Sequence, residues 1–220
     1  MPSSHSPTPG TVAASEIAYV RLQQMIVRLE LLPGALMTEG ALIERLDMGR
    51  TPVREALQRL ALEGFAEIRP RSGIAISPLH ISDWLQVLDA AFGLKIVLAR
   101  SAARFPPLEN DLFRKAALNM QRATVSGNVV SYLEAESNLD LAIAQASANG
   151  FAARAAAPLQ AHARRFWYRF RSEQGLASVA EKHLALINAI MSGDVTGAGQ
   201  RAEECHLTVR RMAEQTASAR

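Results

Sequence analysis

Apolar residues recur at helical spacing along most of the chain, and in one place the period changes to that of a strand. Three helices are predicted over about Ser15–Leu29, Thr38–Leu46 and Met48–Gly64, the first with Ser15 as N-cap and ended by the Pro and Gly of LLPG. The next segment, FAEIRPRSGIAISP, alternates apolar and polar positions around Arg-Pro-Arg-Ser-Gly and predicts a short hairpin. Three helices followed by a hairpin predict a winged helix-turn-helix over residues 15–77.

The chain from residue 78 to residue 220 keeps the helical period and shows no strand signal. Its Ala/Leu-rich segments are separated by breaks at Pro106–Pro107, Ser126–Gly127, Asn149–Gly150, Gly175 and Ser192–Gly193. These breaks predict about six helices of about 15–25 residues, packed as a bundle. The fold is therefore predicted to be mainly α: a winged helix-turn-helix with a small β-hairpin, then an all-α helical bundle. Residues 1–14 are rich in Pro, Ser and Thr, and we expect a disordered tail there.

Composition limits the cell compartment and the kind of chemistry. Hydrophobic residues make up 49% and charged residues 20% of the 220, which is ordinary for a globular protein. No apolar run approaches the ~20 residues of a membrane span, and the N-terminus lacks the pattern of a signal peptide. Cys205 is the one cysteine, so no intramolecular disulfide can form. We therefore expect a cytoplasmic protein without membrane association, with Cys205 as a buried thiol.

The distribution of charge is more informative than its sum. The formal net charge is only +3, and residues 1–77 carry eight arginines against eight acids. Between Arg50 and Arg71, however, five arginines face three glutamates. A basic stripe inside a neutral module predicts a specific contact surface.

The helix predicted over Met48–Gly64 has one apolar and one polar face. At ~100° per residue, its apolar positions cluster around Val53, while the opposite face carries Arg50, Thr51, Arg54 and Gln58. This placement favours a recognition helix, whose first turns enter the major groove of double-stranded DNA, where arginine reads guanine. Arg69 and Arg71 of the hairpin would then form a wing that contacts the DNA backbone or minor groove. The alternative is a solvated helix face that carries arginines by chance.

The segment Arg50-Thr-Pro-Val-Arg-Glu-Ala-Leu-Gln-Arg-Leu-Ala-Leu-Glu-Gly64 resembles the signature of the GntR family of bacterial transcriptional regulators. The resemblance extends over the whole predicted winged helix and implies a homodimer on a short palindromic operator. It assigns DNA contacts to Arg50, Thr51, Arg54 and the wing glycine, Gly73. Two positions depart from the family: Gly49 replaces a Ser N-cap, and Gly40 stands where an arginine often contacts DNA.

The bundle resembles the FCD class of GntR effector domains, helical bundles that bind small carboxylates and often a divalent metal. The resemblance rests on the segments Glu136–Asn149 and Glu181–Ile190 and on Cys205-His206-Leu. It implies a metal site with Asp140, His183 and His206 as ligands, which suits Zn²⁺, Ni²⁺, Mn²⁺ or Fe²⁺. A third His expected four residues after Asp140 is Ala144 here. Direct effector binding without metal, or a role in packing alone, remain alternatives.

A second candidate in the bundle is HARRFWYRFR, residues 162–171. In a long helix the simplest interpretation is apolar packing of its aromatic residues, with the arginines on the outer face. In a later helix, Cys205 is expected to point in another direction from its neighbour His206. Interleaved aromatics and arginines also suit nucleic-acid binding. Alternatively, an anionic effector carboxylate would be held by Arg164, Arg165 or Arg169. Where the class carries an Arg and a Glu in the first bundle helix, this chain has Asp89 and Gly93.

Together these features favour a dimeric transcription factor, a repressor. Its bundle would transmit the binding of a small-molecule effector to the two DNA-binding domains of the dimer. One alternative is a constitutive DNA-binding dimer with a degenerate sensor. Another is an enzyme that uses Asp140, His183 and His206 as an iron site, but we do not expect an enzyme because no cofactor loop or acid/base pair accompanies these residues.

Overall fold

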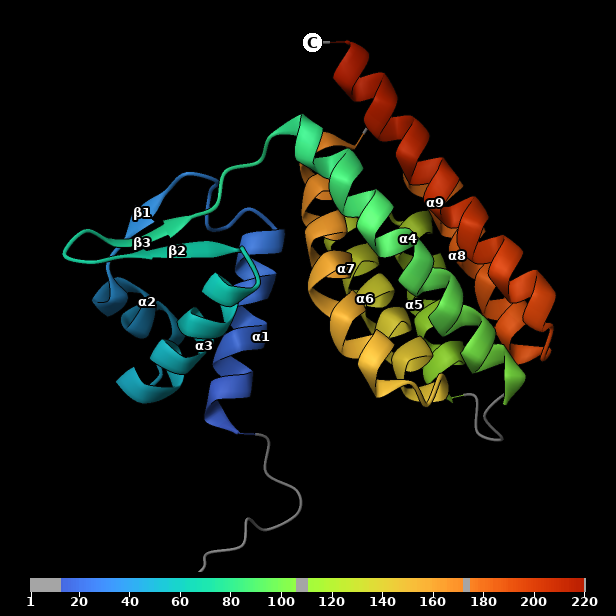
Figure 1. The fold of residues 1–220 in the computed structure, drawn as a ribbon, viewed down its shortest axis with the longest axis horizontal. Coiled ribbons are helices and arrows are strands. Elements are labelled where there is room, and N and C mark those ends of the chain that lie inside the picture. Colours follow the sequence, from blue (N-terminus) through green and yellow to red (C-terminus); the bar gives the residue numbers. More distant parts are fainter. Residues whose placement is uncertain (1–12, 106–110, 172–174, 220) are drawn as a thin grey trace, which may run out of the picture. The chain divides into compact units, whose positions relative to one another are not determined.

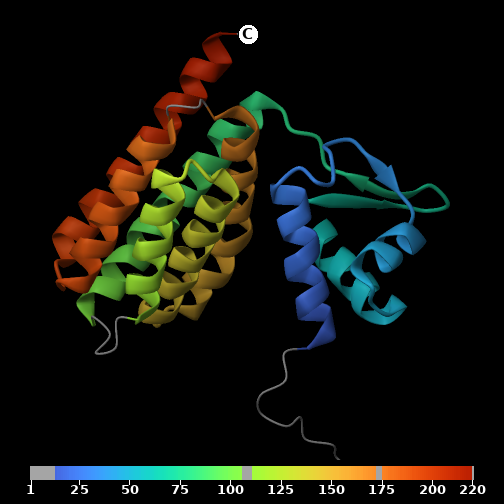
Figure 2. The ribbon, with the colours of Figure 1, turned by 180° about the vertical axis from the view of Figure 1, so that it is seen from behind.

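A computed structural model of the chain describes residues 13–105, 111–171 and 175–219. Most of the predicted N-terminal tail and the predicted break at Pro106–Pro107 lie outside these residues. The chain divides into two compact units, Met1–Pro78 and Leu79–Arg220, which Figures 1 and 2 show from opposite sides.

The first unit contains three helices and a three-stranded sheet. In chain order these are α1 (Ala14–Val27), β1 (Leu36–Met37), α2 (Glu39–Leu46), α3 (Arg50–Leu62), β2 (Ala66–Arg69) and β3 (Gly73–Ile76). The strands are antiparallel in the order β1-β3-β2, and the helices lie on one side of the sheet (Figure 1). The predicted winged helix-turn-helix is confirmed, and β1 is an additional strand that the sequence did not predict.

The helix starts follow local capping chemistry. Thr38 caps α2, because its Oγ1 accepts a hydrogen bond from the backbone N–H of Ala41 at 3.1 Å. The prediction of Ser15 as the N-cap of the first helix was wrong: α1 starts at Ala14, and its N-cap, Ala13, makes no side-chain hydrogen bond. Asp47 adopts a left-handed backbone conformation after α2, with φ 51°, and turns the chain toward α3.

The second unit is a bundle of six helices within the described residues. They are α4 (Ile81–Arg104), α5 (Asp111–Val125), α6 (Val129–Ala146), α7 (Gly150–Phe170), α8 (Gly175–Met191) and α9 (Val195–Ser218). Helix α4 contacts α6, α7, α8 and α9, four of the other five helices of the bundle. The all-α bundle predicted from the sequence is confirmed. No helix in the described ranges is long and apolar enough to cross a membrane.

Small and aromatic residues share the core of the bundle. Ala99 and Ala102 of α4 and Ala198 and Ala202 of α9 are fully buried, which lets these two helices approach closely. Aromatic rings fill the space between α4 and α7, where Trp84 stacks against Phe166 and Phe170 at centroid distances of 6.4 and 5.9 Å. The core thus anchors α4, the helix that also contributes Lys95 to the polar cluster described below.

Candidate functional site

Helix α3 presents a polar face to solvent over its first two turns. Val53, Ala56, Leu57 and Leu60 are buried, as the helical spacing predicted. Four polar side chains on the other face are exposed: Arg50, Thr51, Arg54 and Gln58. Pro52 lies in the first turn, where its missing N–H leaves no hydrogen bond unmade. The arrangement suits insertion of the N-terminal half of α3 into a groove.

A glutamate on α2 holds the arginines of this face. The Nε of Arg54 donates to both carboxylate oxygens of Glu39, at 2.9 and 2.8 Å, and the Nε of Arg50 lies 3.7 Å from the same carboxylate. Both arginines are more than half exposed, and such surface pairs contribute only about 0–1 kcal/mol. Phosphates can therefore replace Glu39 as the partner of these arginines at little cost.

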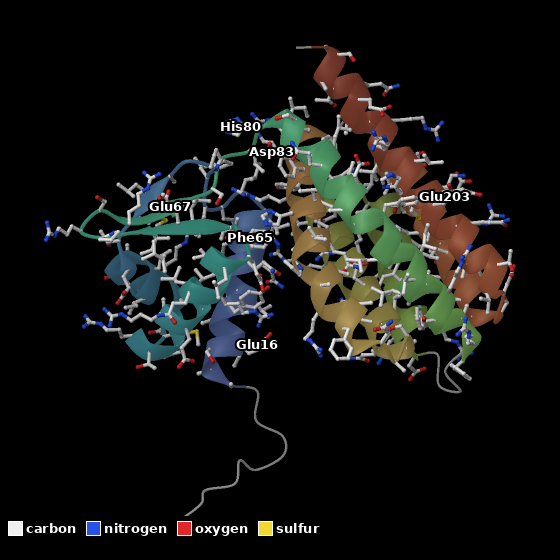
Figure 3. The ribbon with its side chains drawn as sticks, viewed as in Figure 1. Glu16, Phe65, Glu67, His80, Asp83 and Glu203 are labelled. Atoms are coloured by element: carbon white, nitrogen blue, oxygen red, sulfur yellow. The ribbon has the colours of Figure 1, made fainter. Side chains whose placement is uncertain are left out.

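The turn between β2 and β3 carries the predicted wing. Arg69 pairs with Glu67, which is labelled in Figure 3, at 2.8 Å. Arg71, with φ 64°, lies exposed at the tip of the turn. Gly73 has φ 106°, and a Cβ there would run into the carbonyl oxygen of Met37 on β1. Gly73 thus has a structural role in joining the wing to β1, and its predicted DNA contact remains a prediction.

Arg59 has a different role from the other arginines of this stretch. Its guanidinium lies 3.5 Å from the ring centroid of Tyr19 and pairs with Glu16 at 2.8 Å and with Glu63 at 3.1 Å. The hydroxyl of Tyr19 donates to Glu63 at 2.7 Å, and burial and this bond together raise the pKa of Tyr19. These contacts join α3 to α1, so Arg59 orients the recognition helix and does not belong to its exposed polar face (Figure 3 labels Glu16).

The three predicted metal ligands do not come together as a metal-binding group. Asp140 is bonded to Arg164, and the ring of His206 stacks on Phe92 at 4.3 Å. His183 is buried, with its Nδ1 2.8 Å from the Tyr132 hydroxyl and its Nε2 3.2 Å from the Lys95 ammonium. Over the described ranges, no three His, Cys, Asp or Glu side chains are placed to hold a metal ion.

Sequence reasoning missed Lys95, which lies on α4 at the centre of this region. The carboxylates of Glu136 and Asp140 from α6 and the Cys205 thiol from α9 are close enough to influence its charge. Burial opposes the ammonium form, yet these groups outweigh it and raise the pKa of Lys95. Burial also raises the pKa of Cys205 to about 11, so at neutral pH the thiol is uncharged and the carboxylates hold the ammonium. We call Lys95, Glu136, Asp140, Arg164 and His183 the buried charge cluster; Asp140, Arg164 and His183 are buried, and Lys95 and Glu136 are half-buried.

A small cavity of ≈ 60 Å³ adjoins the buried charge cluster. Its polar lining consists of Lys95, Glu136, Asp140, Gln160 and His206, and its apolar lining includes Leu88, Ala91 and Phe92. Cys205 is buried, as predicted, and it lines this cavity together with His206. The volume leaves room for a few waters or a small ligand.

The arginines of residues 162–171 are placed differently from the prediction. Phe166 and Trp167 are buried as expected, but Arg164 and Arg165 are buried too, and only Arg169 of the three candidates is exposed. An outer face for all of them was wrong, because α7 is covered on more than one side. None of the three is among the described residues that line the cavity. Their role as effector ligands remains a prediction.

The comparisons with known proteins agree with both units. A family model for bacterial regulatory proteins of the gntR family matches residues 14–76, and a model for the FCD domain matches residues 94–208. An HTH-type transcriptional regulator in an unstable DNA locus of Streptomyces ambofaciens is 42% identical over 74 residues. That match covers 34% of this chain and 30% of the relative.

Solved structures share the fold over nearly the whole chain. McbR/YncC of E. coli has a TM-score of 0.78 at 19% identity, over 93% of this chain and 99% of that one. A crystal structure from Rhodococcus sp. RHA1, described as a GntR regulator, has a TM-score of 0.71 at 16% identity, over 95% and 100%. At these identities the likeness concerns architecture.

Proposed function

Because the chain belongs to the GntR family of bacterial regulatory proteins, with an FCD domain after its winged helix, we propose that it is a transcriptional regulator that binds a palindromic DNA operator as a homodimer. The family is one of transcriptional regulators and not of enzymes, so the iron-enzyme alternative is set aside.

One observation carries the DNA-binding proposal: the exposed polar face of α3 stands opposite a fully buried one. Arg50, Thr51, Arg54 and Gln58 line the first two turns of the helix. Arg54 can be bidentate to a guanine, and the helix N-terminus favours a phosphate. The wing arginines Arg69 and Arg71 add contacts to the backbone or minor groove.

Selection of duplexes from a random pool by the full-length protein tests this proposal. We expect enrichment of an inverted repeat whose half-sites are about 10 bp or fewer apart, since a two-fold symmetric dimer reads two equal half-sites. A pool that stays random after repeated rounds at ~0.15 M salt would contradict sequence-specific binding.

We further propose that the bundle senses a small carboxylate metabolite and that the protein acts as a repressor. The cavity beside the buried charge cluster supports this, because Lys95 and Gln160 supply donors in it, next to an apolar wall and the carboxylates of Glu136 and Asp140. A ligand that prefers one spacing of the dimer's two winged-helix domains changes the fraction of dimers whose spacing fits the operator. The structure does not support the predicted metal dependence of sensing, because Asp140, one of the predicted ligands, is bonded to Arg164.

A screen that measures the melting temperature with small carboxylates, in buffer that contains a chelator, distinguishes a sensor from a constitutive DNA-binding dimer. A carboxylate that raises the melting temperature and also changes operator affinity supports a sensor. If no member of a broad set does either, the bundle serves dimerisation alone.

A further inference from the structure

The ammonium of Lys95 fixes the protonation of His183. A lysine ammonium can only donate hydrogen bonds, so Nε2 of His183, 3.2 Å away, accepts one with its lone pair. Nδ1 then carries the ring proton and donates it to the Tyr132 hydroxyl at 2.8 Å. An imidazole that accepts a hydrogen bond at Nε2 carries one ring proton only, so the ring is neutral. The lone pair that a metal ion would need is thus occupied.

One of the two carboxylates of the buried charge cluster is also occupied. Asp140 is bonded to Arg164, with both side chains 9% exposed. Glu136 lies 3.8 Å from Nε2 of His183, and the charges of Arg164 and Lys95 lie close enough to attract it. With Glu136 ionised, two cations balance two carboxylates, and with Glu136 protonated the sum is positive. Neither state leaves a net negative charge in the cluster to offset a divalent cation.

Two features of the chain agree with a fixed internal cation. Ala144 removes the imidazole expected after Asp140, and lysine occurs at only three positions, Lys95, Lys115 and Lys182, against 21 arginines. Because arginine is the usual basic residue of this chain, its composition does not explain a lysine at this place in the bundle. It provides a single positive charge and three donors where the chain has lost a metal ligand.

We propose that Lys95 is a built-in cation that takes the place of a divalent metal in this bundle, so that the buried charge cluster is complete without metal. The consequence for sensing rests on the proposed function: an effector would bind here without a metal bridge. The assignment of Lys95 itself does not depend on DNA binding or on any effector, and its test uses neither.

The test measures zinc binding by the full-length protein and by two variants at the cation position. We expect wild type, purified without chelator, to hold far less than one metal ion per chain and to keep its melting temperature in EDTA. Lys95→His removes the ammonium and adds an imidazole beside His183, Glu136 and Asp140. It should bind one Zn²⁺ per chain, with a melting temperature that rises with Zn²⁺ and falls again in EDTA.

Matched variants keep the experiment decisive. Lys115→His makes the same substitution at an exposed lysine of α5 and should gain no such site. Lys95→His combined with His183→Ala should lose the zinc, and Lys95→Ala provides a second variant if Lys95→His does not fold. The proposal is overturned if wild type carries one chelator-removable metal per chain that His183→Ala abolishes. It is equally overturned if folded Lys95→His and Lys95→Ala bind no more zinc than Lys115→His.

Discussion

The Nε of Arg54 on α3 donates to both carboxylate oxygens of Glu39 on α2, at 2.9 and 2.8 Å. This bond joins the two helices of the helix-turn-helix and places a negative charge beside the side chain with which the protein is proposed to read DNA. Glu39 therefore competes with phosphate for the recognition helix.

Removing that charge should strengthen DNA binding. Glu39→Gln frees Arg54 and Arg50 from an exposed pair of about 0–1 kcal/mol, so we expect up to about fivefold tighter binding and a steeper salt dependence. Fluorescence anisotropy at several salt concentrations measures both. Glu44→Gln, on an exposed position of the same helix, is the control for net charge. Weaker binding by Glu39→Gln alone would mean that Glu39 orients the arginines for their bases.

Gly73 should tolerate no side chain, for a reason that Gly34 does not share. Both have positive φ, at 106° and 79°, but a Cβ at Gly73 meets the backbone of Met37, whereas a Cβ at Gly34 meets nothing within 4 Å. Gly34→Ala should lose only the ~1–2 kcal/mol of left-handed strain. Gly73→Ala should in addition separate β1 from β3, which hydrogen exchange of the β1 and β3 amides will show as loss of protection. Equal exchange in the two variants would refute the steric argument.

The pair between Asp140 and Arg164 gives a prediction for the stability of the bundle. Arg164→Met leaves a buried carboxylate without its partner and should lower the free energy of unfolding by about 3–5 kcal/mol. Asp140→Leu with Arg164→Met removes both charges and should recover most of the loss. Both tryptophans, Trp84 and Trp167, lie in the bundle, so their fluorescence in a denaturant titration reports this unit. A double variant as unstable as the single one would contradict the account.

The first unit was predictable because its signals are local. The helical period of α3, Pro52 in its first turn and the change of period after Gly64 depend on neighbouring residues. Strand β1 was not predicted, because two residues are too few to show a period and because its pairing with β3 is a tertiary contact. Local pattern thus predicted the exposed polar face of α3 but not the full sheet that supports the wing.

The centre of the bundle was less predictable because its chemistry joins distant residues. Lys95 and His183 are 88 positions apart, and nothing near Lys95 in the sequence marks it as a partner of an imidazole. Arg164 and Arg165 were expected outside because the neighbouring aromatics already filled the apolar side of α7. A family pattern supplied Asp140, His183 and His206, but only the packing of α4 shows that a lysine stands among them.

The most direct test of the central claim compares Arg54→Ala with wild type on the selected operator and on a scrambled duplex. If α3 reads bases, Arg54→Ala should lose about 1–3 kcal/mol, or roughly 5- to 150-fold, on the operator and much less on scrambled DNA. Arg211→Ala, which removes an exposed arginine from α9, should match wild type on both. An equal loss on both duplexes would reduce Arg54 to a phosphate contact, and no loss on either would contradict recognition by this helix.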